Sequence, residues 1–307
     1  MGECQVRNYS RRGFAAYLLA LLHPRVRAQG TPPQASQAPS GTTPVACRTY
    51  RCDAVVLFLG MTVFRRAGVG GGEASLEETG DGETRRHTYF FAGGSDPKRA
   101  HGLNRLGWIR ETVVGNGAAP SAADYFGVMT SSPEESFEHA RKAMDDPVPG
   151  RCAFSAVSGR NVAGRSRSAV THFEYGSTTM WSDRALIDHA QAIFRGPVDW
   201  RETAWPNSPN QPPPTFLLAL ATSLKQRAKR AAGRYVYNEQ EYTLELDTLP
   251  VGKDRLVPVH GKIRNLHTGK ESLFRLWLDA GSPSVVPVRI EYQARSFLRL
   301  TFEAVPV

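Results

Sequence analysis

Residues 241–304 alternate apolar and polar side chains with a period of two. The pattern is clearest in EYTLELDT, SLFRLWLD, VVPVRIEYQ and SFLRLTFEA. Because successive side chains of a strand point to opposite faces of a sheet, each stretch predicts a β-strand with one buried face and one wet face. The separators NLHTGKE, DAGSPS and QARS are short enough for hairpins. We therefore expect an antiparallel meander in which opposite charges pair across the wet face.

Three stretches with apolar stripes predict helices. The first covers residues 133–145 after a Ser132 cap, and the second covers residues 183–195. The third begins at the Thr215 cap and ends at Gly233. Its basic run KQRAKR puts cations at the negative end of the helix dipole, so a solvated helix end explains the run. Contact with an anionic lipid is the alternative.

The first half of the chain is also rich in strands but less regular. AVVLFLGMTVF, residues 54–64, is apolar on both faces and predicts a strand that is covered on each side. ETRRHTYFFAG, GWIRETVVG and ADYFGVMT predict further strands, and residues 160–180 predict two more. We expect a mainly β (α+β) fold, with a large curved antiparallel sheet or incomplete β-barrel. About three helices would cover one face or opening.

The start of the chain predicts an export signal. Its apolar run, residues 14–22, is too short to cross a bilayer. Basic residues precede the run, and small residues precede an expected cut after Ala28. The stretch around Arg11, Arg12 and Phe14 resembles the twin-arginine signal Ser/Thr-Arg-Arg-x-Phe-Leu-Lys and departs from it at the last two positions. A basic amphipathic helix, or the tail of an intracellular protein, is the alternative.

Composition divides the chain into three parts. The signal peptide is followed by residues 29–46, rich in Pro, Ser, Gln and Thr, which cannot bury enough surface to order and predict a flexible linker. Residues 47–307 are expected to form one β-rich domain in the periplasm or outside the cell. Of the net charge of +9, five arginines and one glutamate in residues 1–28 contribute +4, which leaves +5. This mild charge, with no recognition motif, argues against nucleic-acid binding and allows peripheral membrane association.

No catalytic motif is found in the sequence. GVGGGEA lacks the phosphate-loop pattern, since Glu73 stands where GxGxxG requires glycine, and it predicts a hairpin turn or bulge. HExxH, CxxC and GxSxG are absent, so we predict no metal site, no cofactor and no catalytic residue. Cys47, Cys52 and Cys152 remain after signal removal, and any two of them are candidates for a disulfide in an oxidising compartment.

Aromatic residues are the remaining candidates for a binding site. Trp108, Trp181, Trp277 and Tyr292 would line a ligand if the concave side of the curved sheet is hollow. The alternative is that these rings fill or flank the core, as aromatic side chains generally do.

The C-terminal third resembles a known family. GRYVYNEQEYTLEL and the segment ending in PVRIEY, residues 287–292, are similar to an uncharacterised exported bacterial domain of unknown function with a C-terminal β-meander. The resemblance covers the last strands well and residues 55–78 only vaguely. It implies a curved, open antiparallel sheet and an export signal, and it implies no activity.

These observations lead to one preferred function and two alternatives. We expect a non-enzymatic envelope protein that binds a lipid or other apolar or amphiphilic ligand inside the curved sheet, or has a structural role. A periplasmic hydrolase or cofactor-dependent enzyme that is exported folded is the first alternative. An assembly factor that docks through the exposed edge of the meander is the second.

Overall fold

The computed structural model describes residues 44–306, except 59–60, 81–84, 101–103, 117–118, 131–150, 207–208 and 296–297. The signal-peptide residues Arg11, Arg12, Phe14 and Ala28 lie outside the described residues, as does the helix predicted at 133–145. The predicted linker overlaps the first strand at residues 44–46. None of the described helices is long and apolar enough to cross a membrane.

In the part of the chain that the structure describes, one antiparallel sheet of fourteen strands dominates, with two helices, α3 (Arg184–Ile193) and α4 (Phe216–Lys225). The strands are β1 (Pro44–Phe58), β2 (Met61–Thr79), β3 (Arg85–Ser95), β4 (Leu106–Asn116), β5 (Ala119–Thr130), β6 (Arg151–Val162), β7 (Arg165–Gly176), β8 (Arg201–Ala204), β9 (Arg230–Tyr237), β10 (Gln240–Thr248), β11 (Leu256–Asn265), β12 (Glu271–Asp279), β13 (Arg289–Arg295) and β14 (Leu298–Ala304).

The sheet consists of two meanders, β1 to β8 and β9 to β14, which pair with each other through β1 and β14. Its strand order is β8-β7-β6-β5-β4-β3-β2-β1-β14-β13-β12-β11-β10-β9, so the first and last strands of the chain pair in the interior of the sheet. The edges are β8 and β9, and the sheet is not closed into a barrel. The predicted mainly β class and the large, incompletely closed antiparallel sheet are therefore confirmed.

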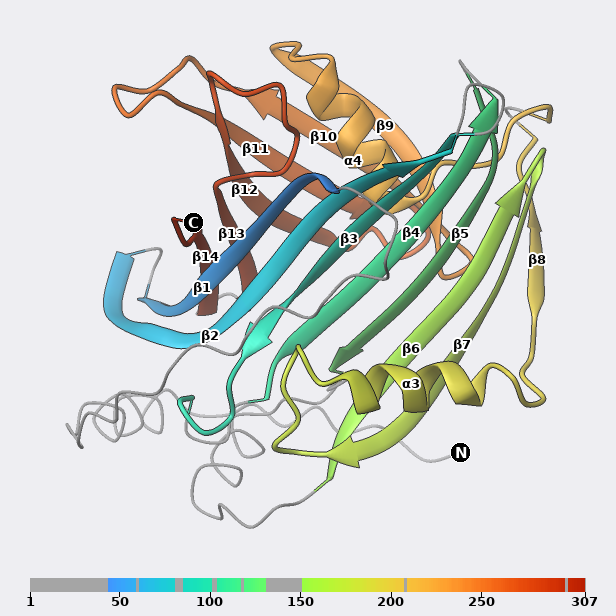
Figure 1. Ribbon diagram of the computed structural model, residues 1–307, viewed down its shortest axis with the longest axis horizontal. Coiled ribbons are helices and arrows are strands. Elements are labelled where there is room, and N and C mark those ends of the chain that lie inside the picture. The colour runs from blue at the N-terminus through green and yellow to red at the C-terminus, as the bar shows by residue number, and fades with distance from the viewer. Residues whose placement is uncertain are drawn as a thin grey trace, which may run out of the picture. The chain divides into compact units, whose positions relative to one another are not determined.

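The sheet curves around α4. This helix contacts β9 and β10 at one end of the strand order and also contacts β3 and β4. Tyr125 on β5 and Tyr237 on β9 have ring centroids 5.4 Å apart, although nine strands lie between β5 and β9 in the sheet order. Figure 1 shows α4 between the two groups of strands. The face toward α4 is the concave face, and period-two alternation buries its apolar side chains, including Tyr50, Leu244 and Phe302.

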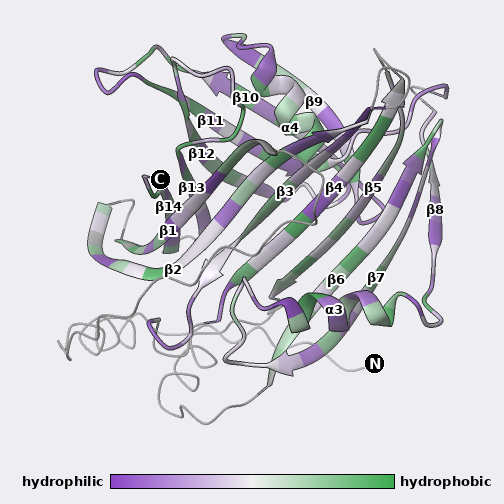
Figure 2. Ribbon diagram, viewed as in Figure 1, coloured by the Kyte–Doolittle hydropathy of each residue, from purple (hydrophilic) through white to green (hydrophobic). Residues whose placement is uncertain are grey.

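The second helix, α3, covers the convex face of β4 to β7. Leu186, Ile187 and Ala190 are buried against a cluster that includes Val128 and Phe154. Asp183 caps the helix, because its carboxylate accepts a hydrogen bond from the Ala185 amide at 2.9 Å. The helix predicted at 183–195 is therefore confirmed. Figure 2 shows hydrophobic and hydrophilic bands alternating along the strands on either side of it.

The prediction of about three helices is wrong for the part of the chain that the structure describes, which holds two. The helix that starts after Thr215 also ends earlier than predicted, at Lys225 instead of Gly233. Arg227 has a φ of 47°, in the left-handed region where a right-handed helix cannot continue. From Arg230 onward the backbone pairs with β10, and Gly233 lies opposite Leu244.

The single strand predicted at residues 54–64 is in fact a hairpin. β1 ends at Phe58 and β2 begins at Met61. The prediction fails because the apolar residues of β1 continue directly into those of β2, so no run of polar residues in the sequence marks the end of one strand and the start of the next. The glycine-rich stretch lies within β2, where the register shifts opposite Asp53 and Gly68 has a φ of 64°. The predicted bulge is therefore confirmed.

Opposite charges pair across the convex face, as the alternation predicts. We call this set of side chains the acid–arginine cluster, and it consists of Arg51, Asp53, Arg65, Arg275, Arg289, Glu291, Arg299 and Glu303. Glu291 was expected on a wet face but is buried, because three arginines from β12, β13 and β14 cover its carboxylate. Tyr292, expected on the buried face, is 43% exposed.

Gly261 on β11 accommodates a neighbouring aromatic ring. It lies opposite Phe274, and a Cβ atom at Gly261 would clash with that ring. We expect Gly261→Ala to lower the free energy of unfolding by about 1–3 kcal/mol, because the ring must leave its packed position. Gly107→Ala on β4, where a Cβ meets open space, is the matched control in denaturant titrations. Equal effects of the two substitutions would contradict this explanation.

Candidate functional site

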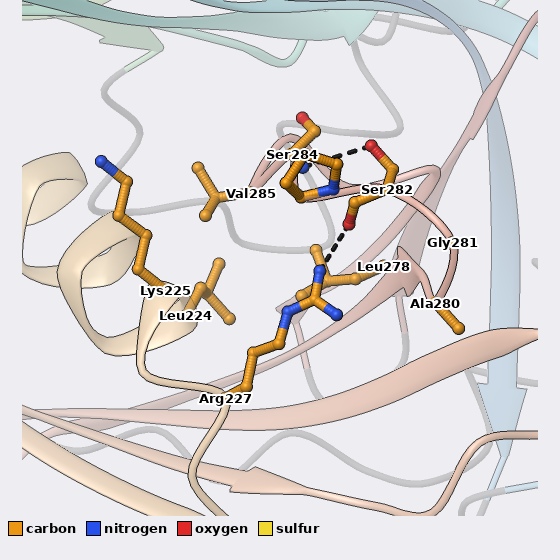
Figure 3. A pocket seen from close by; sticks show the side chains of 10 residues that line it. Leu224, Lys225, Arg227, Leu278, Ala280, Gly281, Ser282, Ser284 and Val285 are labelled. Carbon is orange, nitrogen blue, oxygen red and sulfur yellow. Dashed lines mark hydrogen bonds between the residues drawn. The ribbon is translucent and has the colours of Figure 1, made fainter.

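A cleft of about 320 Å³ opens between the C-terminal end of α4 and the loop that joins β12 to β13 (Figure 3). We call it the α4 cleft. The residues that line it come from three elements of the concave side and are Leu224, Lys225, Arg227, Leu278, Ala280, Gly281, Ser282, Pro283, Ser284 and Val285.

Leucines form the floor of the α4 cleft. Leu224 belongs to the apolar stripe of α4, and Leu278 is the last inward-facing residue of β12. Each side chain is 5% exposed and belongs to the core cluster under α4. Val285 packs against the same cluster from the loop. The floor of the cleft is therefore apolar.

The loop on the other side of the cleft is held by short-range hydrogen bonds. Asp279 accepts from the Gly281 amide at 2.8 Å, and the Ser282 hydroxyl accepts from the Ser284 amide at 3.2 Å. The Ser284 hydroxyl accepts from the Val286 amide at 3.1 Å. These side chains stabilise the turns of the loop by hydrogen bonds to nearby backbone amides. The wall of the cleft is therefore ordered although it contains no helix or strand.

Cations stand at the rim. Lys225 is in the last turn of α4, and Arg227 follows it in the left-handed conformation. Figure 3 shows the Arg227 side chain reaching across to the loop, where its guanidinium donates to the Ser282 carbonyl. Among the described residues that line the cleft, none is acidic. The arrangement can therefore bind an anionic group above a short apolar surface.

The interior of the curved sheet contains a buried carboxylate that the sequence did not reveal, at the opposite end of α4 from the cleft. Glu111 on β4 has no exposed surface and accepts hydrogen bonds from the amides of Leu217 at 2.9 Å and Leu218 at 3.0 Å. The Thr215 hydroxyl also donates to this carboxylate. Burial raises the pKa of Glu111 to about 7, although these hydrogen bonds favour the charged form.

Glu111 acts as the N-terminal cap of α4. The expected cap, Thr215, makes no side-chain hydrogen bond to the helix amides. A carboxylate at that position accepts two otherwise unpaired amide hydrogens and faces the positive end of the helix dipole. The sequence near α4 gives no indication of this cap, because Glu111 is more than a hundred residues from the helix. In the sequence it resembles an ordinary polar position of an alternating strand.

The four aromatic residues predicted to line a ligand do not meet in one concavity. Trp108 and Trp181 pack on the convex face near α3, and a Cβ atom at Gly71 would contact the Trp181 ring. Trp277 is also on the convex face, with the Arg289 guanidinium 4.7 Å from its ring centroid. Tyr292 is exposed on β13. The concave face is instead covered by α4 and by other aromatic and aliphatic side chains.

The three cysteines are free thiols in the structure. Cys47 and Cys52 lie on the same extended strand, where five residues span roughly 16 Å. A disulfide needs Cα atoms within about 7 Å, so this pair is excluded by the strand geometry. Cys52 faces the concave side, whereas Cys152 packs with the convex cluster near α3. Within the described residues, no group of three or more His, Cys, Asp or Glu side chains is placed to hold a metal ion.

Comparison with known proteins gives one distant structural likeness. No protein-family model matches the chain, and no curated protein sequence matches it. A solved structure, the crystal structure of a β-barrel-like protein of the domain of unknown function DUF1849 from Brucella abortus, is similar with a TM-score of 0.39 and 10% sequence identity. The match covers 84% of this chain and 94% of that chain.

Proposed function

We propose that this chain is an exported, non-enzymatic envelope protein that binds an anionic amphiphile, a lipid or lipid-like molecule, at the α4 cleft. The observation that supports this proposal is that the cations Lys225 and Arg227 line the same cleft as the apolar side chains of Leu224 and Leu278. The proposal of export rests on the twin-arginine-like start of the sequence.

The cleft suits the head of an amphiphile and the first part of its chain. Its volume is small for a whole lipid, so the remainder of the apolar chain would leave the cleft toward the membrane surface. Lys229, exposed in the segment after the cleft, adds one more cation, whereas Arg230 is paired with Asp247. Electrostatic attraction to an anionic membrane surface contributes about 1 kcal/mol for each nearby Lys or Arg.

Neutralising the rim should weaken binding to anionic vesicles. We expect the double variant Lys225→Gln and Arg227→Gln to lose about 2 kcal/mol of binding free energy, roughly thirtyfold in Kd. The measurement is co-sedimentation of the purified full chain with vesicles that contain phosphatidylglycerol, and with vesicles of phosphatidylcholine alone. Organic extraction of the protein followed by mass spectrometry should identify a co-purifying anionic amphiphile.

A matched control distinguishes binding at the α4 cleft from the effect of lowering the net positive charge of the protein. The variant Lys253→Gln and Arg264→Gln removes the same charge from exposed positions outside the cleft. It should bind anionic vesicles nearly as well as the parent protein. Equal loss in both double variants, or equal binding to both kinds of vesicle, would show that the α4 cleft is not the binding site.

A further inference from the structure

A second depression, of about 460 Å³, lies on the convex face between α3 and strands β4 to β7. It shares no lining residue with the α4 cleft and is independent of the function proposed above. We call it the arginine groove. The side chains that matter for its chemistry are Trp108, Arg110, Asp124, Arg160, Arg167 and Trp200.

The sheet register places two arginines side by side. Arg160 on β6 lies directly opposite Arg167 on β7, and like charges in this position repel each other. Asp124 on β5 lies opposite Arg160, with 3.6 Å between its carboxylate and the guanidinium. Glu202 on β8 lies opposite Arg167. The row across four strands is therefore acid, arginine, arginine, acid, with positive charge concentrated at its centre.

Arg167 and Arg110 keep their hydrogen-bond donors available. The Arg167 guanidinium lies over the Trp200 ring, 5.0 Å from its centroid, and is not seen in an ion pair with a described residue. Arg110, exposed on β4 beside the row, likewise has no acidic partner among the described residues. A guanidinium stacked on an aromatic ring is held in place while its N–H groups remain free for an oxyanion.

A row of five aromatic rings runs beside the groove, and three of them, Trp108, Phe126 and Trp200, line it. The centroid distances along it are 5.3 Å, 5.7 Å, 5.9 Å and 6.2 Å, through the rings of Phe90, Trp108, Phe126, Phe194 and Trp200. The row runs from β3 to the segment that follows α3. Its ring contacts therefore pack that segment, which forms one wall of the groove, against the sheet, which forms the other. An apolar ring face can rest on this surface while the arginines bind a charged substituent.

We propose that the arginine groove binds a small acidic sugar, a ring that carries one or two carboxylates or phosphates. The guanidinium groups match the geometry of these oxyanions, and the aromatic row matches the C–H face of the ring. Asp124 and Glu202 at the two ends of the row repel an extended polyanion, which favours a small ligand over a nucleic-acid strand. The ligand is a free sugar acid or the end residue of an acidic polysaccharide.

Titration calorimetry and tryptophan fluorescence of the full chain test this proposal. The probes are glucuronic acid, glucose 6-phosphate, a trigalacturonate, neutral glucose and a short oligothymidylate. We expect at least one acidic sugar to bind and to change the emission of the groove tryptophans, and neutral glucose not to bind. Preference for the trigalacturonate over the monomers would identify a polysaccharide end as the source of the ligand.

Two single variants locate the site. Arg110→Gln and Arg167→Gln should each weaken binding of the acidic sugar at least about tenfold, since each removes a charge-assisted hydrogen bond. Arg264→Gln, an exposed arginine outside the groove, should have no effect. Thermal unfolding of each variant verifies that the protein is folded.

Four results would overturn the proposal: failure of every acidic sugar to bind, equal binding of glucose, tighter binding of the oligothymidylate, or unchanged affinity in both groove variants. The double variant at the α4 cleft should bind the acidic sugar normally. The two proposals can therefore fail separately.

Discussion

Replacing Glu111 with alanine should lower the free energy of unfolding by about 3–5 kcal/mol. The substitution removes the acceptor of two α4 amide hydrogens and of the Thr215 hydroxyl in a site with no exposed surface. Buried donors without acceptors are costly, and the lost side chain also leaves a cavity. The loss is measured by chemical denaturation followed by circular dichroism. Glu174→Ala, at an exposed position on β7, is the control and should change stability by less than about 0.5 kcal/mol.

The same residue should give stability a specific dependence on pH. Burial raises the pKa of Glu111 from 4.5 to about 7, so the folded protein holds this proton more tightly than the unfolded chain does. The stabilisation from the proton is complete below about pH 4.5 and is lost as the pH rises through about 7. Its size is on the order of 3 kcal/mol.

Glutamine isolates this contribution, because it cannot titrate. The stability difference between the parent protein and Glu111→Gln should shrink as the pH rises from about 4.5 to 7. The difference between the parent protein and Glu174→Gln should stay constant over that range. A gap that widens with pH would mean that the carboxylate is stabilised in its charged form, and would contradict the raised pKa of Glu111.

Replacing Asp53 with alanine is the second substitution for which we expect a large effect, a loss of about 2–4 kcal/mol in unfolding free energy. Asp53 is 1% exposed and accepts hydrogen bonds from Arg65 at 2.6 Å and from the Gly68 amide at 2.7 Å. The second of these bonds holds the bulge of β2 against β1. Alanine would leave the Gly68 amide without this acceptor and separate Arg65 from its buried partner.

The control for Asp53 is an ion pair on the surface. Asp247 on β10 lies 3.2 Å from Arg230, and its side chain is largely exposed. Asp247→Ala should cost less than about 1 kcal/mol, because exposed pairs contribute little. Asp53→Asn keeps an acceptor for the Gly68 amide and should lie between the two. Similar losses for Asp53→Ala and Asp247→Ala would show that burial of the acid is unimportant.

The strands were predictable wherever one face is buried and the other is wet. Leu244, Leu246, Leu276 and Leu278 are buried as the alternation requires. Where several long arginines cover one face of the sheet, a polar residue on that face can be buried. Glu291 is such a residue, and its predicted exposure to solvent was therefore wrong. Runs of basic residues are equally ambiguous. Lys225–Arg230 looked like a helical end, and β9 begins there.

The candidate sites depended on contacts between distant parts of the chain, which explains why the sequence predicted them poorly. The basic run at Lys225 was noted, together with its lipid alternative, but its apolar floor includes Leu278, far along the chain. Trp108 was a candidate for the concave side and instead lines the convex groove with Trp200. Alternation tells which residues share a face of a sheet. It does not tell which way the sheet curves.

The pairing of β1 with β14 has a consequence for synthesis of the protein. During translation, β1 can pair with β2 early, but its other edge has no partner until β14, residues 298–304, has been synthesised. An unpaired edge of this length readily captures a strand from another chain. Mispairing with another chain is therefore most damaging before β14 docks, because that step covers the β1 edge and unites the two halves of the sheet.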